Sequence, residues 1–329
     1  VITSLVYRHT PKTLRFLMVD PKMVELSVYN TLPHLRHKVI TDSRDAASVL
    51  KWAEMEMQER YELLAANGCR NIQDFNRRHQ NGDSLKLPTR KDVAFEDTHY
   101  RGEILPYIVV VIDELADLMM TVQGEVEPPL ARLAQKARAI GIHLLLATQR
   151  PSVNVITGLI KANFPSRIAF RVASQVDSRT IIDQVGAEKL LGKGDMLFLT
   201  ADMPKPKRIQ GALIGDEETG KVTDFIRMQR PPAYDEEVVS QPVQLNGKGG
   251  IVPTGAADAD DEMFKDAVNV VIENRKASTS LLQRRLRIGY GRAARLIETM
   301  EEQGIVGPAD GSRPRDVLVT SPDDVFGGG

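Results

Sequence analysis

The stretch Tyr107–Glu114, YIVVVIDE, joins an unbroken apolar run to two adjacent carboxylates. Its β-branched residues from Val109 to Ile112 are typical of a central strand that is buried on both faces, as in a parallel sheet. Asp113 and Glu114 follow at the carboxyl end, where open α/β sheets form their ligand crevices. An Asp there can hold hydrated Mg²⁺ beside nucleotide phosphates, and a Glu can orient or deprotonate an attacking water. The pattern favours a Walker B site over the plainer alternative, a solvated turn.

A second buried strand is predicted at Gly141–Thr148, GIHLLLAT, and it ends in Gln149 and Arg150. If the two strands are parallel neighbours, their carboxyl ends meet in one crevice, where Gln149 could sense a γ-phosphate or position water. The usual partner of such a site is the phosphate loop G-x-x-x-x-G-K-[ST], which appears nowhere in these residues.

Strand and helix patterns alternate through residues 1–230, which predicts an α/β domain with a mostly parallel sheet. Residues 71–101 are polar and irregular in pattern, so we expect a surface insertion there. The predicted strands and helices of this region, besides the two strands above, are Leu14–Val19, Asp42–Ala66, Glu127–Ile140, Arg167–Phe170, Ser178–Asp183, Glu188–Leu191 and Met196–Leu199.

The composition is that of an ordinary globular protein, with 329 residues, 42% hydrophobic and 26% charged. The net charge of −1 means that any nucleic-acid contact must come from a local patch or a ring of subunits. The single cysteine, Cys69, excludes an intramolecular disulfide and fits a reducing cytoplasm. No apolar run is long enough to cross a bilayer, so we expect this segment to be cytoplasmic and to make no membrane contact.

A change in composition at Arg230 marks a predicted linker over residues 231–261, rich in proline, glycine and acidic residues. Residues 262–320 then show three helical patterns followed by two short strand candidates, Ile305–Val306 and Val317–Val319, around a turn. Three helices and such a wing predict a winged helix-turn-helix domain. Residues 321–329 are predicted to be a disordered tail.

The third helix of this domain carries candidate base-reading side chains. Arg292, Arg295 and Glu298 recur at helical spacing; an Arg can pair with guanine and a Glu can accept from cytosine. Nearby arginines would meet phosphates: Arg284, Arg285 and Arg287. The alternative is a basic, solvated face on a winged helix that binds protein.

Two further groups are ambiguous from spacing alone. Arg132 and Arg138 fall on the predicted Glu127–Ile140 helix, where a solvated face and an arginine finger are both possible. Asp20, Pro21 and Lys22 follow the first strand. By themselves they favour a simple turn; the alternative is a strand-end Asp and Lys that contact DNA or couple to the Walker site.

These residues resemble the FtsK/SpoIIIE family of bacterial DNA translocases along nearly the whole chain. The stretches that carry the resemblance are DPKMVELSVYNTLPHL (Asp20–Leu35), YIVVVIDELADLMM (Tyr107–Met120), LARLAQKARAIGIHLLLATQRPSVNVITGLIKANFPSRIAFRV (Leu130–Val172), DSRTIIDQVGAEKLLGKGDML (Asp177–Leu197) and RKASTSLLQRRLRIGYGRAARLIETMEEQGIV (Arg275–Val306).

The resemblance implies a RecA-like P-loop NTPase core that assembles as a homo-hexamer around double-stranded DNA. Such a motor moves along DNA by ATP hydrolysis with Mg²⁺, in chromosome segregation and cell division. It also implies a C-terminal winged-helix gamma domain that reads short oriented DNA sequences and contacts the XerCD recombinase.

By the same resemblance, Asp113 holds Mg²⁺, Glu114 activates water, Gln149 is the sensor and Arg138 is a finger acting in trans. The family's reading helix has the pattern N-R-A-A-R-x-I-E. Here Arg292, Arg295 and Glu298 match, whereas Gly291 replaces the Asn and removes one amide that could contact a base.

In the family, the phosphate loop lies just upstream of the helix with which this chain begins, and membrane-spanning segments at the septum lie further upstream. We therefore expect a truncated chain with weak or no ATPase activity by itself. Two alternatives remain: a fragment that only binds specific DNA sequences, and a related conjugative or packaging ATPase.

Overall fold

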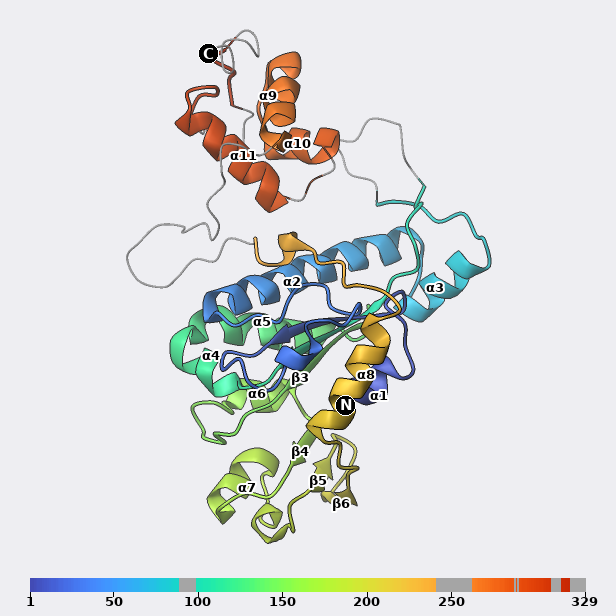
Figure 1. The fold of residues 1–329 in the computed structure, drawn as a ribbon, viewed down its shortest axis with the longest axis vertical. Helices are drawn as coiled ribbons and strands as arrows, with labels where there is room; N and C mark the ends of the chain where they lie inside the picture. The colour runs from blue at the N-terminus through green and yellow to red at the C-terminus, as the bar shows by residue number, and fades with distance from the viewer. Residues whose placement is uncertain (89–98, 241–261, 287, 289, 309–314, 320–329) are drawn as a thin grey trace. The chain divides into compact units, whose positions relative to one another are not determined.

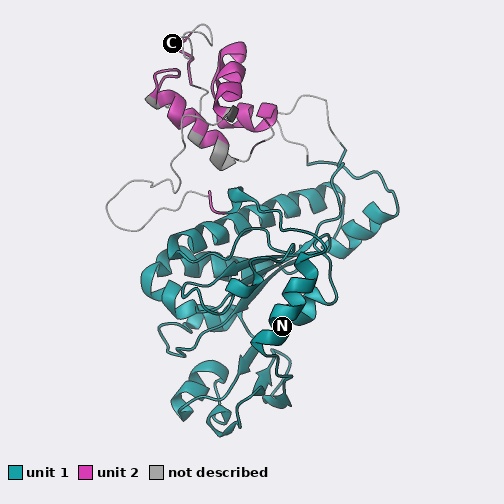
Figure 2. Ribbon diagram, viewed as in Figure 1, with its two compact units in different colours: residues 1–238, 245–249 teal, residues 239–244, 250–329 magenta. Residues whose placement is uncertain are grey.

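The computed structural model describes residues 1–88, 99–240, 262–286, 288, 290–308 and 315–319 (Figure 1). The chain divides into two compact units, which are considered separately (Figure 2). The first extends to Val238, and the second holds the described residues from Glu262 onward.

A three-stranded parallel sheet forms the centre of the first unit, in the order β1 (Leu14–Val19), β2 (Tyr107–Ile112) and β3 (Ile142–Leu146). Val19, Ile112 and Leu146 are in register, so the three strands end level with one another. All but the first residue of β2 is buried. This confirms the prediction of a central strand in a parallel sheet.

Helices cover both faces of this sheet. On one face, α1 (Ile2–Val6) and α8 (Asp216–Arg227) contribute to the cluster that contains Phe16, Val109 and Val111. On the other lie α2 (Ser43–Ala66), α4 (Leu115–Thr121) and α5 (Gln123–Lys136) (Figure 1). Alternate strand residues point to opposite faces, so β1 and β2 are buried between the two groups of helices. In β3, at the side of the sheet, only Ile142 is buried and His143 is exposed, so the prediction of a second buried strand is wrong.

The predicted helix at Asp42–Ala66 is present as α2. Asp42 caps it by accepting a 2.7 Å hydrogen bond from the backbone N–H of Arg44. Residues 71–101 were predicted to be a surface insertion, and this is wrong for their first part. Helix α3 (Ile72–Gln80) begins at the Asn71 cap and buries Ile72 and Phe75 completely.

The strand candidates that follow do not extend the parallel sheet. Strands β4 (Arg167–Ala169), β5 (Asp195–Leu199) and β6 (Lys207–Gln210) form a separate antiparallel sheet. Three short helical segments accompany it: α6 (Gly158–Asn163), α7 (Gln175–Ile182) and the 3₁₀ turn η2 (Ala187–Lys189). A buried cluster of Ala169, Ile182, Ala187 and Leu190 forms its core.

A docked segment, residues 233–238, ends the first unit and includes the 3₁₀ turn η3 (Glu236–Val238). Asp235 accepts from Arg36 at 3.2 Å, and its N–H donates to the carbonyl of Arg36 at 2.7 Å. The carbonyl of Ala233 accepts from Arg15 at 3.1 Å, and Val238 is fully buried. The first unit therefore continues past residue 230, where the change in composition placed the start of the linker.

The second unit contains α9 (Glu262–Asn274), α10 (Thr279–Leu286) and α11 (Tyr290–Glu302) around one apolar core. Two antiparallel bridges are present: Ala277, between α9 and α10, pairs with Arg315, and Val306, after α11, pairs with Val317. The helices lie where they were expected, and the Val306–Val317 bridge joins the two strand candidates of the predicted wing.

Candidate active site

Polar side chains from all three parallel strands meet at the level carboxyl edge of the sheet. Asp20 follows β1, and Asp113 and Glu114 follow β2. Thr148 and Gln149 follow β3, separated from its last residue by Ala147. Backbone hydrogen bonds continue past the strand ends, from Asp113 N–H to the Val19 carbonyl at 3.0 Å and from Leu115 N–H to Ala147 at 2.8 Å. The edge is therefore rigid, and the predicted meeting of the Asp113–Glu114 and Gln149 ends is present.

Glu114 is almost completely enclosed at this edge, with 1% of its side chain exposed. Its Oε1 accepts from the backbone N–H of Ala116 at 3.2 Å and from the hydroxyl of Thr148 at 2.5 Å. Its Oε2 accepts from the backbone N–H of Gln149 at 3.2 Å and from Nζ of Lys22 at 3.3 Å. Because Ala116 lies in the first turn of α4, Glu114 is also the N-cap of that helix.

Burial alone would raise the pKa of Glu114, because it disfavours the charged form. The hydrogen bonds from Thr148, Gln149, Ala116 and Lys22 favour the carboxylate and outweigh this effect, so the pKa lies below its ordinary value. Glu114 is thus an ionised, fully hydrogen-bonded carboxylate.

Lys22 reaches Glu114 from a loop that Asp20 holds in place. Asp20 is fully buried and accepts three backbone N–H bonds, from Lys22 at 3.1 Å, Glu25 at 3.1 Å and Leu26 at 3.0 Å. Spacing alone favoured a simple turn, whereas the structure pairs Lys22 with Glu114. The available sequence signal was a polar triplet directly after a buried strand, but only the β1–β2 pairing locates its partner.

Asp113 has the opposite environment. Burial raises its pKa, and the negative charges of Asp20, Glu25 and Glu114 raise it further, whereas Lys22 lowers it. Within the described residues, no hydrogen bond or ion pair involves its half-buried carboxylate. Such a group favours a nearby cation, which would stabilise its charged form.

The described part of the chain contains no cluster of three or more His, Cys, Asp or Glu side chains arranged to hold a metal. Mg²⁺ beside phosphates commonly uses only one or two protein carboxylates and completes its shell with water and phosphate oxygens. Asp113 alone therefore fits the predicted Mg²⁺ contact.

Gln149 contributes its backbone N–H to Glu114, and its side chain is exposed at the same edge. Arg138 was predicted on the helix before β3, but α5 ends at Lys136 and Arg138 lies in the following turn, next to Gly141. Arg138 is exposed and precedes β3 by four residues, so it lies at the amino end of this strand, whereas Gln149 follows the carboxyl end. The strand between them is about 17 Å long. Arg132 is held in an ion pair with Glu54 on α2.

A separate set of candidates lies in the second unit. Arg284 and Arg285 occupy the last turn of α10, where both are exposed, and Glu298 is exposed on α11. Arg284 also donates to the carbonyl of Ser280 at 3.3 Å. The backbones of Gly291, Arg292 and Arg295 belong to α11, but the side chains of the two arginines fall outside the described structure. Arg287 as a whole also falls outside it.

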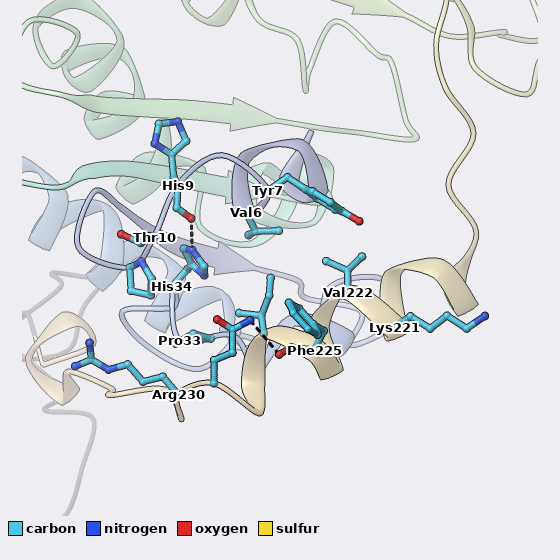
Figure 3. Close-up of a pocket in the computed structure, with 13 residues that line it drawn as sticks. Val6, Tyr7, His9, Thr10, Pro33, His34, Lys221, Val222, Phe225 and Arg230 are labelled. Carbon is cyan, nitrogen blue, oxygen red and sulfur yellow. Dashed lines mark hydrogen bonds between the residues drawn. The ribbon is translucent and has the colours of Figure 1, made fainter.

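A cavity of about 620 Å³ in the first unit lies apart from these residues, between α1 and α8 (Figure 3). Its lining includes Val6, Tyr7, Val222 and Phe225 and none of the predicted site residues. His34 borders it and bonds through Nε2 to the carbonyl of His9 at 2.8 Å (Figure 3). The carboxyl edge, rather than this apolar hollow, carries groups suited to hydrolysis.

The parallel sheet with polar and acidic groups at its carboxyl edge places the first unit in the class of α/β proteins that bind ligands at this edge. Comparison with known families then identifies the group within that class. Residues 1–153 match the FtsK/SpoIIIE family, and residues 258–320 match the Ftsk gamma domain. The two matches together cover most of the chain, which therefore belongs to the FtsK/SpoIIIE family.

Curated relatives support this assignment. The chain is 52% identical over 98% of its length to "DNA translocase SftA" of Bacillus subtilis, and 51% identical over 98% to "DNA translocase FtsK" of Halalkalibacterium halodurans. It spans only 31% and 38% of those two proteins.

Solved structures agree with the fold. The pCW3 conjugation coupling protein TcpA with ATPγS matches at 29% identity and a TM-score of 0.52, over 65% of this chain and 57% of that one. The type VII secretion ATPase EccC of Thermomonospora curvata matches at 20% identity and a TM-score of 0.55, over 72% of this chain and 26% of that one. The latter match concerns the fold alone.

Proposed function

We propose that this chain supplies the hydrolytic edge and the DNA-reading unit of an ATP-driven double-stranded DNA translocase, which acts in chromosome segregation and cell division. The observation that carries the proposal is the pair Asp113 and Glu114 at the carboxyl edge of β2, in a chain about half identical to proteins named DNA translocases. The two carboxylates differ in environment. Asp113 is stabilised by a nearby cation, as a metal contact is, whereas Glu114 is held ionised, which a group that accepts a proton must be.

In the proposed reaction, water attacks the γ-phosphorus of ATP, the bond to the β-phosphate oxygen breaks, and ADP and phosphate leave. Asp113 would hold Mg²⁺, which when bound would supply positive charge to neutralise the phosphates. Glu114 orients the attacking water and accepts its proton, and Gln149 senses the γ-phosphate from the same edge.

Arg138 supports a multi-subunit arrangement. It is exposed at the sheet edge opposite Gln149, too far away to serve the site of its own subunit. We propose that it enters the site of a neighbouring subunit in a homo-hexameric ring around DNA.

In the described part of the chain, no helix is both long and apolar enough to span a membrane. We place this segment in the cytoplasm, in a longer protein anchored at the septum, with XerCD as a partner of the gamma domain.

The hydrolysis proposal is tested on two forms of the protein. For the 329-residue chain itself we expect weak or no ATPase activity, because it contains no G-x-x-x-x-G-K-[ST] sequence to bind phosphates. The second form, called the extended protein below, adds before Val1 the residues that precede the match in the SftA relative. We expect it to hydrolyse ATP in a DNA-stimulated manner, and Glu114→Gln to reduce kcat by about 10²-fold or more.

The control for this experiment is Lys12→Met, which removes an exposed lysine from an exposed ion pair with Glu103. We expect it to leave kcat unchanged. Robust DNA-stimulated hydrolysis by the 329-residue chain would contradict the first expectation. Full activity of the Glu114→Gln extended protein would contradict the role of Glu114.

The second unit is tested by DNA binding at several salt concentrations. Arg285→Ala should weaken binding to all duplexes alike and reduce the salt dependence by about one counterion, as expected for a phosphate contact. Arg295→Ala should cost about 1–3 kcal/mol on a preferred oriented sequence and relax specificity there. Arg227→Ala, in the first unit, is the control. An equal loss on every sequence would show that Arg295 contacts phosphate instead of a base.

A further inference from the structure

Glu114 has no acceptor position left for a water molecule. An ionised carboxylate offers about four lone-pair sites on its two oxygens. In the structure these are met by four donors, namely the N–H groups of Ala116 and Gln149, the hydroxyl of Thr148 and the ammonium of Lys22. A carboxylate in this state cannot accept a proton from an attacking water until one donor leaves.

Lys22 is the donor best able to leave. The two N–H groups belong to backbone at the sheet edge, and the Thr148 hydroxyl bonds at 2.5 Å. Lys22 instead reaches Glu114 with a flexible side chain that is 34% exposed, and its 3.3 Å contact is long for a charge-assisted bond, which is usually about 2.7–2.9 Å. Its departure would free one acceptor position on Oε2, which keeps its bond from Gln149, while Oε1 stays bonded to Ala116 and Thr148.

The loop that carries Lys22 is built at a conformational cost. Met23 adopts a positive φ of 58°, which disfavours a side chain of its kind. Backbone strain of this type persists only where the surroundings enforce it. Here Asp20 enforces the loop conformation by accepting three backbone hydrogen bonds. The two residues after Lys22, Met23 and Val24, are 63% and 68% exposed.

We propose that Lys22 is a positioning residue that holds Glu114 in a resting state, and that its withdrawal from Oε2 makes the carboxylate available to the attacking water. The role depends on the proposed function of Glu114 as the base. The exposed Met23–Val24 tip lies next to Lys22 in the chain, so a contact made there can reach Glu114 through a single side chain.

The pairing itself is tested on the 329-residue chain by a double-mutant cycle of Lys22→Met and Glu114→Gln, with urea unfolding of the first unit as the measurement. We expect Lys22→Met to lower the unfolding midpoint when Glu114 is present. It should leave the midpoint unchanged, or raise it, in the Glu114→Gln background. Equal effects of Lys22→Met in both backgrounds would overturn the proposal.

The consequence for hydrolysis is tested on the extended protein with and without duplex DNA. Lys22→Met should raise DNA-free kcat several-fold with little change in KM, and so reduce the ratio of stimulation by DNA. Lys22→Arg, which keeps a cation on a long side chain, should restore most of the wild-type ratio. Lys12→Met is the matched lysine control.

The results separate the two ideas. If Glu114→Gln abolishes hydrolysis but Lys22→Met leaves both kcat and the DNA ratio unchanged, Glu114 is the base and Lys22 does not restrain it. A loss of kcat in Lys22→Met, with an unchanged unfolding midpoint, would show that Lys22 assists Glu114 and would also overturn the restraint. If Glu114→Gln retains hydrolysis, it is the proposed function that fails.

Discussion

Asp113 and Glu114 are neighbours in the chain, yet the structure shifts their pKa values in opposite directions. Glu114 turns inward and is stabilised as a carboxylate by four donors. Among the residues that the structure describes, none donates to the Asp113 carboxylate, which faces the negative charges of Asp20 and Glu25. The sequence motif predicted two acidic groups at a strand end, but only the folded edge gives each one its own environment.

Asp195 provides a pH-dependent prediction at the residue scale. Arg208 donates two hydrogen bonds to its carboxylate, at 2.9 and 2.7 Å, and the N–H of Leu191 donates a third at 2.7 Å. These bonds lower the pKa of Asp195 from 3.8 to about 2. A carboxylate with a lowered folded-state pKa stabilises the protein above the unfolded value and loses this contribution as pH falls through the folded value.

We therefore expect the Asp195→Asn variant to have a lower urea unfolding midpoint than the wild-type chain at pH 5–7. The difference between the two proteins should shrink as pH falls from about 4 toward 2. Glu217→Gln, in an exposed pair with Lys221, is the control and should show little difference at any pH. A constant difference between wild type and Asp195→Asn across this range would contradict the assignment.

At the scale of single elements, helix α3 allows a test of whether its segment belongs to the core, as the structure shows, or is a surface insertion, as the sequence predicted. Phe75 is fully buried and packs edge-to-face against Tyr100 with ring centroids 5.3 Å apart. Phe75→Ala should destabilise the first unit by about 3–5 kcal/mol, measured by urea unfolding. Phe170→Ala, at a 55% exposed position, is the matched control and should change stability by less than about 0.5 kcal/mol. Similar small effects of both would restore the interpretation of residues 71–101 as a surface insertion.

The sequence predicted those elements whose apolar residues form a clear local pattern. Strands β1, β2 and β3 are apolar runs with polar ends, and α2 repeats apolar residues along 24 positions after an Asp cap. Helix α3 was missed because it has nine residues and buries only Ile72 and Phe75. Ile72 and Phe75 are three residues apart, as on one face of a helix, but two apolar residues are too few to distinguish this helix from polar surface chain.

Pairing between distant segments could not be predicted in the same way. Strand β6 contains one partly buried apolar residue, Ile209, and exists because it pairs with β5. For the candidate site, Asp113, Glu114 and Gln149 followed from strand ends, whereas the Lys22 contact depends on a residue 92 positions from Glu114. Arg138 was misplaced on a helix because the turn after Lys136 keeps helix-like backbone at Ala137.

At the scale of the whole molecule, the docked segment 233–238 decides where the first unit ends. Composition alone placed the boundary at residue 230, since prolines and acidic residues are typical of linkers. The same acidic residues are used as anchors, with Asp235 on Arg36 and Glu236 on His37 at 3.4 Å. Linker-like composition and docking are therefore compatible in this segment.

This boundary predicts the stability of two truncated chains. A chain ending at residue 230 loses the buried side chain of Val238 and the contacts of Tyr234 and Asp235, whereas one ending at residue 240 keeps them. We expect the shorter chain to be less stable by about 2 kcal/mol or more in urea unfolding. The full-length chain, followed by a probe in the first unit, is the reference and should match the chain ending at residue 240. Equal midpoints for the two truncations would place the boundary at residue 230.

The donor-filled surroundings of Glu114 also affect how an inactivated, nucleotide-trapping variant of this protein should be made. Glutamine has the shape of glutamate, but its amide NH₂ would face a fixed donor whichever way it is turned, either the N–H of Ala116 or the N–H of Gln149 together with Lys22. Such a buried mismatch costs about 1–3 kcal/mol. Glu114→Gln is thus an isosteric change without being a silent one. Pairing it with Lys22→Met removes one of the opposed donors and gives a trap in which lost turnover can be told apart from lost stability.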